Sequence, residues 1–229
     1  MENKDESGNS PDRRARKRSR KKFLHYFPKG FRDPKYKSWE RNYKLDAHQA
    51  FQEQLNKVEF KRLLANGKFS EIATRAIRIE TKTNLLFSFE KMALRDAVKS
   101  PAGAKKFATG LYNYIYGEGT LKNRFEKFTE AIASLPRKQT RVLTWPLQTV
   151  FGFLAKPEEH FFLKPRVTRE AAKKYGYDFK YQSRPNWETY KDVLGFAKQV
   201  RKDNADLRPN DFIDLQSFIW VMGSDEYPD

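Results

Sequence analysis

The feature that most constrains the fold is a succession of segments with helical apolar spacing, each bounded by residues that start or stop helices. Ser100-Pro101 opens the segment 100–116, Thr120 opens 120–135, and Gly176 closes 167–176. Apolar residues three and four positions apart share one face of a helix, and side-chain caps satisfy the free N–H groups at its start. The same reasoning predicts helices over 46–64, 70–79, 83–98, 186–204 and 210–222. Val58 falls on the apolar face of the first of these, and we expect Phe89 and Met92 to face inward in the third.

These segments predict a mainly α fold: a single globular helical domain of about eight helices over residues 46–229. We expect an irregular middle at 137–166, with a short helix after Pro146 and a strand or extended loop at 160–165. Hydrophobic residues make up 38% of the 229 positions and aromatic residues 15%, which is enough to build a substantial core.

The first 45 residues do not show the helical apolar spacing of the rest of the chain. Residues 1–22 have almost no apolar side chain, which predicts a disordered arm. Eight cations of this arm are candidates for contacts with phosphate groups: Arg13, Arg14, Arg16, Lys17, Arg18, Arg20, Lys21 and Lys22. The alternative is that the arm is a solubilising tail. Residues 23–45 alternate aromatic rings with Lys and Arg, so we expect an extended segment that either stacks on bases or anchors a loop to the core.

The charge indicates a polyanionic partner. The chain has 46 Lys and Arg against 29 Asp and Glu, a net charge of +17, and about half of this excess lies in the first 44 residues. DNA is the favoured partner, RNA remains open, and an anionic membrane surface ranks second. The apolar runs are too short to predict a membrane span. The oligomeric state is left open by the sequence.

The sequence lacks the residues that several classes of catalytic and metal-binding site require. The chain has no cysteine, and its three histidines, at 25, 48 and 160, do not have metal-ligand spacing. No glycine-rich nucleotide-binding motif is present. We therefore predict no cofactor and no metal site. The N-terminal residues do not form an apolar targeting segment, so we expect a cytoplasmic location.

Asp214 is the first catalytic candidate. It lies in the apolar stretch 208–223, where we expect Asn210 to cap the last helix and Asp211 to occupy its first turn. A carboxylate one turn further in, among apolar residues, has two interpretations. It is a general base or stabiliser of a sugar cation, or it is paired with Arg208 or another arginine.

Lys164, in the stretch 162–168, is the second catalytic candidate. A lysine at the rim of an apolar pocket has a lowered pKa and can form a Schiff base. The alternative is that Lys164 contacts phosphate together with Arg166.

A third group suits an unpaired base. Trp187 and Tyr190 are neighbours on one helix, beside Arg184. Trp145, which precedes Pro146, admits the same two interpretations as these rings. The group can form a stacking platform, with Asn186 reading a base edge. The alternative is a helix start whose rings pack into the core.

Glu80 and Lys82 suggest a different chemistry. An acid and a lysine two residues apart on a strand are typical of the magnesium site of restriction-type nucleases. The apolar spacing around Glu80 is helical, however, which weakens the pattern.

These observations predict a DNA-binding protein that acts on DNA. The favoured interpretation is a metal-independent, base-excising enzyme of the DNA glycosylase type, in repair or in defence against phage. One alternative is a non-catalytic nucleic-acid-binding protein, which needs only the cations and the rings. The other is the magnesium-dependent, restriction-type nuclease built on Glu80 and Lys82.

Overall fold

Helices form all the regular structure of residues 11–136 and 141–229, the ranges that a computed structural model describes. They are α1 (Pro11–Tyr26), α2 (Pro34–Tyr36), α3 (Asn42–Leu55), α4 (Lys57–Ala65), α5 (Phe69–Thr81), α6 (Ser88–Ala97), α7 (Pro101–Tyr116), α8 (Leu121–Ala133), α9 (Trp145–Ala155), α10 (Pro165–Tyr175), α11 (Trp187–Asp203) and α12 (Phe212–Gly223). Short 3-10 turns lie at η2 (Gly30–Arg32) and η4 (Ala205–Leu207). The predicted all-helical class is confirmed, but the helices outnumber the eight or so that we expected.

In the described ranges, none of these helices is both long enough and apolar enough to cross a membrane.

Several helix starts lie within a residue of their predicted positions because the predicted caps form. The side chains of Ser100, Thr120 and Asn186 each accept a hydrogen bond from the backbone N–H three residues further on, at 3.1, 3.2 and 2.9 Å. The predicted short helix after Pro146 is α9. Residues 160–164 are irregular and form no strand, which settles that alternative.

The prediction of a disordered arm is wrong for residues 11–22, which belong to α1; residues 1–10 lie outside the described ranges. Low hydrophobicity misled the prediction, because the inward face of α1 uses the small residues Ala15 and Ser19 followed by Phe23. These pack closely against α10 and α12. Tertiary packing therefore supports a helix that the local sequence does not favour.

The expected extended segment at 23–45 is also wrong, because most of it is helical. Asp33 caps a helix by accepting from the Lys35 backbone N–H at 2.9 Å, and Pro34 supplies the first helical residue. That helix continues without interruption from α2 through η3 (Lys37–Arg41) into α3. The element η3 is a π-helical turn, in which the Asn42 N–H bonds to the Lys37 carbonyl oxygen five residues earlier.

Two other helix boundaries differ from expectation. The predicted helix 46–64 breaks at Asn56, whose side chain caps α4, and Val58 is consequently 79% exposed instead of inward-facing. Helix α6 starts at Ser88, several residues later than predicted. Phe89 and Met92, which we expected in the core, are instead 50% and 62% exposed.

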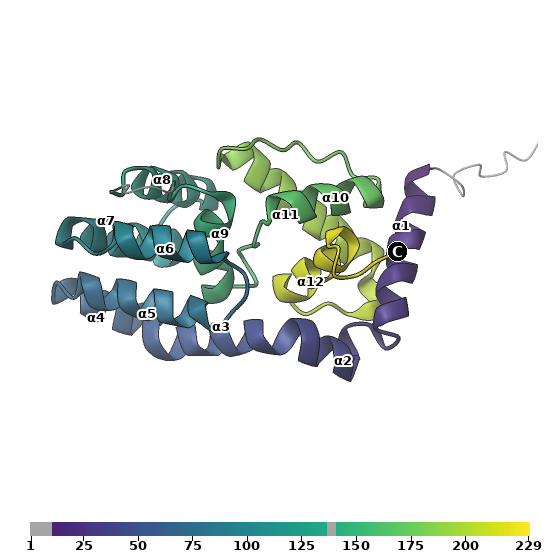
Figure 1. Cartoon of the computed structure of the whole chain (residues 1–229), viewed down its shortest axis with the longest axis horizontal. Coiled ribbons are helices and arrows are strands. Elements are labelled where there is room, and N and C mark those ends of the chain that lie inside the picture. The colour runs from purple at the N-terminus through teal and green to yellow at the C-terminus, as the bar shows by residue number, and fades with distance from the viewer. Residues whose placement is uncertain (1–10, 137–140) are drawn as a thin grey trace, which may run out of the picture.

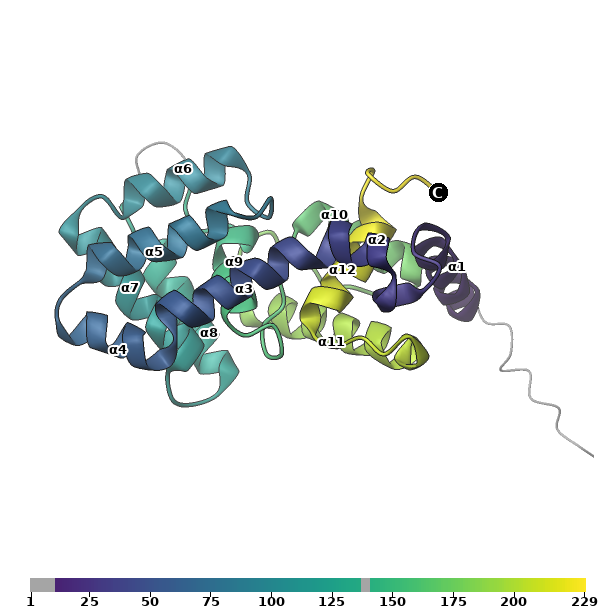
Figure 2. The same cartoon turned by 90° about the horizontal axis from the view of Figure 1, so that it is seen from below.

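The helices form an elongated body with two ends (Figure 1). Helices α4 to α8 lie at one end, and α10, α11, α12 and α1 lie at the other. The long helix that contains α3 runs between them, as Figure 2 shows from below. Helix α9 is buried along its whole length, and one continuous hydrophobic core joins both ends. The C-terminus returns to lie beside α1.

Candidate functional site

Helix α1 presents a row of exposed cations on the side that faces away from the body. Positions three and four residues apart share one face of a helix, opposite the buried Ala15 and Ser19. We call this set the outer basic face: Arg14, Lys17, Arg18 and Lys21. No carboxylate of the described residues forms an ion pair with these four side chains.

The cations on the flanks of α1 are held by carboxylates from the C-terminal half of the chain. Arg16 lies 3.4 Å from Asp203, and Arg20 lies 2.6 Å from Asp206. Lys22 pairs with Asp229 at 2.6 Å. These pairs fix the helix on the body, and no carboxylate of residues 11–136 and 141–229 pairs with the outer basic face. The remaining predicted cation of the arm, Arg13, is also exposed.

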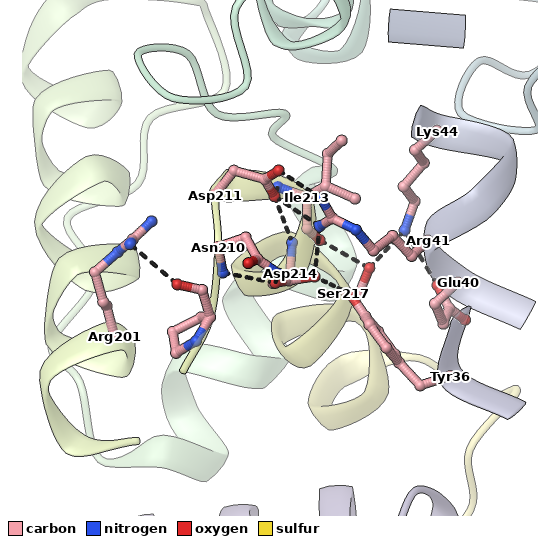
Figure 3. Close-up of polar contacts among 11 residues, drawn as sticks. Tyr36, Glu40, Arg41, Lys44, Arg201, Asn210, Asp211, Ile213, Asp214 and Ser217 are labelled. Atoms are coloured by element: carbon pink, nitrogen blue, oxygen red, sulfur yellow. Dashed lines mark hydrogen bonds and ion pairs between the residues drawn. The ribbon is translucent and has the colours of Figure 1, made fainter. Parts of the chain in front are cut away.

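The second feature is a buried network around Asp214 (Figure 3). Tyr36 Oη and Arg41 Nη1 each donate to Asp214 Oδ1 at 2.6 Å. The other carboxylate oxygen, Oδ2, accepts from the backbone N and the side-chain Nδ2 of Asn210, at 2.7 and 2.8 Å. We call these residues, together with Asp211, the Asp214 network.

The π-helical turn explains why two residues of one helix reach the same oxygen. In an α-helix, positions five apart, such as Tyr36 and Arg41, are about 140° apart around the axis. A turn with i to i+5 bonding brings such positions back to one face. Arg41 also binds both oxygens of Asp211, at 2.9 and 2.7 Å. Asp211, and not Asn210 as predicted, caps α12 by accepting from the N–H groups of Ile213 and of Asp214 itself.

This geometry favours the ion-pair interpretation of Asp214, and the arginine partner is Arg41 and not Arg208. The Asp214 side chain has no exposed surface, and its two oxygens already accept four hydrogen bonds. Burial and the Asp214 charge raise the pKa of Tyr36, so Tyr36 stays a protonated donor. The carboxylate therefore has no free lone pair directed at a reacting water.

A pocket of about 380 Å³ lies next to this network. Its lining residues come from 39–44, 84–87, 162–164 and 216–227, so the π-helical turn and α12 both contribute. We call it the Lys44 pocket. Of the two catalytic candidates, Lys164 lines this pocket and Asp214 does not.

Lys44 is an ammonium group inside the protein, since its side chain is 1% exposed. Its Nζ donates to Glu40 Oε2 at 3.1 Å and to Ser217 Oγ at 2.9 Å. Tyr227 Oη donates to the other oxygen of Glu40 at 2.6 Å. Burial alone would lower the pKa of Lys44, but the nearby Tyr43 and Glu40 outweigh it and raise that pKa. Lys44 therefore stays charged and is neutralised by Glu40.

Lys164 forms another part of the same wall. Its Nζ donates to the Leu85 carbonyl oxygen at 2.8 Å and lies 3.5 Å from the centre of the Phe87 ring. Glu90 Oε2 is 4.0 Å away. Burial lowers the pKa of Lys164, and the charge of Glu90 only partly opposes this effect.

Gln216 is the lining residue with an unsatisfied polar atom. The residue is 3% exposed, and its Oε1 accepts no hydrogen bond from any residue in the described ranges. Large rings surround the pocket as well. Trp39 and Phe87 are 54% and 55% exposed, which is unusual for side chains of this size. Phe87 stacks on Phe89, with ring centres 5.5 Å apart.

The predicted stacking platform lies inside the core. Trp145 is 1% exposed and Tyr190 is fully buried, and both rings pack on Phe125. Trp187 is partly buried against the same ring. This arrangement favours the core-packing interpretation for all three rings.

The polar members of that group, and Arg166, have ordinary structural positions. Asn186 caps α11, as its hydrogen bond to the Thr189 N–H indicates. Arg184 is exposed near the start of this helix. Arg166 is exposed and pairs with Asp225 at 2.8 Å, so it does not join Lys164 in the pocket.

Glu80 and Lys82 lie at the end of α5 and not on a strand. Glu80 is buried and accepts from the Leu86 N–H at 3.3 Å, whereas Lys82 is exposed. Residues two apart on a helix point to different sides. Within 11–136 and 141–229, no group of three or more His, Asp or Glu side chains is arranged to hold a metal ion.

No family model, curated protein or solved structure matches this chain. The site is therefore interpreted from its own geometry.

Sequence reasoning missed most of the Lys44 pocket. Glu40 and Lys44 are four residues apart, which is a readable signal for a helical ion pair, but we expected that segment to be extended. Gln216 lies in a run of apolar residues and gives no signal of its own. We did not predict the exposure of the Trp39 and Phe87 rings, because the predicted boundaries of the helices near them were incorrect.

Proposed function

We propose that this protein binds DNA through the outer basic face of α1. One observation carries the proposal: the four cations of this face are exposed and without an ion pair to the described residues, while carboxylates engage the flanking cations of the same helix. Unpaired cations on a rigid element release counterions from DNA when they meet phosphates. A helix also has the right width for the major groove.

The position of α1 supports the same proposal. The helix lies at one end of the elongated body, so its outer side meets no other helix in the part of the chain that the structure describes (Figures 1 and 2). Its ion pairs with Asp203, Asp206 and Asp229 hold it in one orientation. A preorganised row of cations loses less conformational freedom on binding than a flexible arm does.

Charge reversal of the outer basic face tests this proposal. We expect R14E/K17E/R18E/K21E to weaken binding to a fluorescently labelled DNA duplex by about 100-fold or more at low salt. The slope of log K against log salt concentration should become shallower by up to about four, because about one counterion is released per phosphate contact. Fluorescence anisotropy across a salt series measures both quantities.

The matched control reverses four exposed lysines elsewhere on the body: K57E/K61E/K68E/K127E. It changes the net charge equally and should leave most of the affinity intact. Equal losses in both variants would contradict a localised interface. RNA duplexes in the same assay distinguish the two nucleic acids. Binding to anionic vesicles, with none to either nucleic acid, would replace DNA by a membrane surface.

Base excision is a second candidate function. Of the two catalytic candidates, Lys164 is the one that could perform it, because Lys164 lines the Lys44 pocket and Asp214 does not. A neutral amine in a pocket can attack the sugar C1′ atom while the bond from C1′ to the base breaks; the base leaves with the electron pair and takes up a proton. Loss of a proton from nitrogen and opening of the sugar ring then give an imine, which water hydrolyses to free the lysine. Burial lowers the pKa of Lys164, which increases the fraction of the neutral amine that this step requires.

Trapping with borohydride tests this candidate, because it reduces the imine to a stable protein–DNA adduct. We expect the adduct with duplexes that contain damaged or phage-modified bases, and its loss in Lys164→Met. Alkali-dependent strand breaks should accompany it. Binding without adduct or breaks, on every substrate, would leave the non-catalytic function.

A further inference from the structure

We infer that the Lys44 pocket binds a nucleobase, either in a free nucleoside or nucleotide or as an unpaired base in a strand. The second form rests on the proposed DNA binding, whereas the first stands without it. The volume of about 380 Å³ lies in the range of small-ligand sites and accommodates one nucleoside.

The rings of the pocket provide surface for a flat heterocycle. Trp39, Phe87, Trp220 and Tyr227 all contribute to the lining. Two of them, Trp39 and Phe87, are more than half exposed. Lys164 Nζ and the Phe89 ring already contact the Phe87 ring, so Trp39 offers the stacking surface that a ligand can use without rearrangement. Stacking on aromatic side chains is the main way in which proteins hold unpaired bases. The pocket is thus suited to a planar ligand.

Gln216 provides the polar contact that a base needs. A buried acceptor without a hydrogen bond destabilises the protein relative to a satisfied one. The side-chain amide of Gln216 can turn about its terminal bond and present its oxygen or its nitrogen to a ligand. Nucleobases carry both donors and acceptors on their edges. A bound base therefore satisfies an atom that the protein leaves unpaired.

The charges favour a neutral ring over a phosphate inside the pocket. Lys44 is already paired with Glu40, and Lys164 lies near Glu90. Glu226 adds a further negative charge to the lining. A buried phosphate would find no uncommitted cation. Outside, the Lys35 Nζ lies 4.2 Å from the centre of the Trp39 ring, where it can meet the phosphate of a nucleotide or strand.

The pocket and α1 are adjacent, which relates the inference to the proposed function. The Tyr26 ring of α1 packs against the Tyr227 ring, with centres 4.9 Å apart. Phe27, directly after α1, packs against Trp39 with ring centres 6.4 Å apart. A strand held by α1 therefore passes close to the pocket mouth. The π-helical turn that shapes this mouth is also a feature frequent at functional sites.

Titration of the full chain with nucleosides and 5′-nucleotides tests the inference, with calorimetry and tryptophan fluorescence as readouts. Two of the chain's four tryptophans, Trp39 and Trp220, line the pocket, so binding should quench their emission. We expect Gln216→Leu to weaken nucleobase binding about tenfold, as the loss of one buried hydrogen bond implies. Trp39→Ala should weaken it tenfold or more, through the loss of stacking.

Gln148→Leu is the matched control. Gln148 is also buried with an unpaired Oε1, but it lies on α9 and does not line the pocket. This variant should bind nucleobases like the unmodified protein. Similar losses in Gln148→Leu and Gln216→Leu would overturn the inference.

Oligonucleotides distinguish the two sources of the base. Saturable binding of free nucleosides identifies a small-molecule site. Quenching only by single strands, or by duplexes with a mismatch, identifies an unpaired base of a strand. In that case Gln216→Leu should reduce the quenching while fully paired duplex affinity, which depends on α1, persists. No quenching and no heat with any nucleoside or oligonucleotide overturns the inference, even where α1 still binds DNA.

Discussion

Replacing Arg41 with methionine is expected to lower the free energy of unfolding by about 3–5 kcal/mol, because the change leaves a buried carboxylate without its cation. The Arg41 side chain is 13% exposed, and its guanidinium bonds to Asp211 and Asp214. Methionine fills similar volume but supplies no donor. The link from Arg41 to the start of α12 would then be lost, although Tyr36 would still donate to Asp214. Urea denaturation followed by circular dichroism measures the change.

Arg62→Met is the matched control for this prediction. Arg62 pairs with Glu59 on the surface, and its side chain is 58% exposed. Exposed ion pairs contribute at most about 1 kcal/mol, so this variant should remain close to the unmodified protein. Comparable losses in the two variants would show that burial does not determine the effect.

A double-mutant cycle with Asp214→Asn isolates the interaction itself. Arg41→Met in the Asp214→Asn background removes a cation whose buried partner is already neutral. The double variant should therefore be more stable than the sum of the two single losses predicts, by about 1 kcal/mol or more. Strict additivity would indicate that Arg41 acts through Asp211 alone. The unfolding transition of Asp214→Asn also separates a structural role of this residue from a catalytic one.

The helices could be predicted from sequence where the information is local. Ser100, Thr120 and Asn186 each cap the helix that we assigned to them, because a cap and its N–H partner are three residues apart. The same local reasoning failed at α1. There residues 11–22 lack large apolar side chains, and the helix depends on packing against α10 and α12 and on carboxylates such as Asp203 and Asp229 from the other end of the chain.

The candidate site depends almost entirely on contacts between distant segments. Asp214 was recognisable as a buried acid, but nothing local identifies Arg41 as its partner. The exposed surface of Phe87 and Phe89 results from a late start of α6, which the apolar spacing alone does not predict. Periodicity locates the faces of helices. It does not say which faces meet, and a pocket lined by four segments requires that information.

The pocket and the network share the same two helices, which has a consequence for experiments. The π-helical turn carries Arg41 toward Asp214 and Trp39 toward the pocket, while α12 carries both Asp214 and Gln216. Variants of the network therefore alter the pocket by displacing its walls. Variants of Trp39 and Gln216 do not touch the buried ion pairs. The ligand experiments consequently rely on the second kind of variant.

The protein is expected to lose stability as the pH falls from 7.5 to 5, because His160 is buried in its neutral form. Burial lowers the pKa of His160 to about 3, from an ordinary value of 6.5. Between these two pKa values the unfolded chain binds a proton that the folded chain does not. The contribution of neutral His160 to the free energy of unfolding is therefore complete above pH 6.5 and declines as the pH falls. The slope approaches about 1.4 kcal/mol per pH unit. The total loss at pH 5 should be about 2 kcal/mol.

His160→Leu removes the titrating group and should flatten the pH dependence by that amount. At pH 7.5 the substitution should be nearly neutral, since neither ring nitrogen of His160 has a hydrogen-bond partner among the described residues, and Glu159, 4.0 Å away, forms an ion pair only with the protonated ring. Phe128→Leu is the control, because Phe128 stacks on the same Tyr114 ring that His160 contacts. This control should lower stability equally at both pH values. Urea denaturation at pH 7.5 and pH 5, above the titration range of ordinary carboxylates, gives the comparison. An unchanged slope in His160→Leu would show that protonation of another group causes the acid sensitivity.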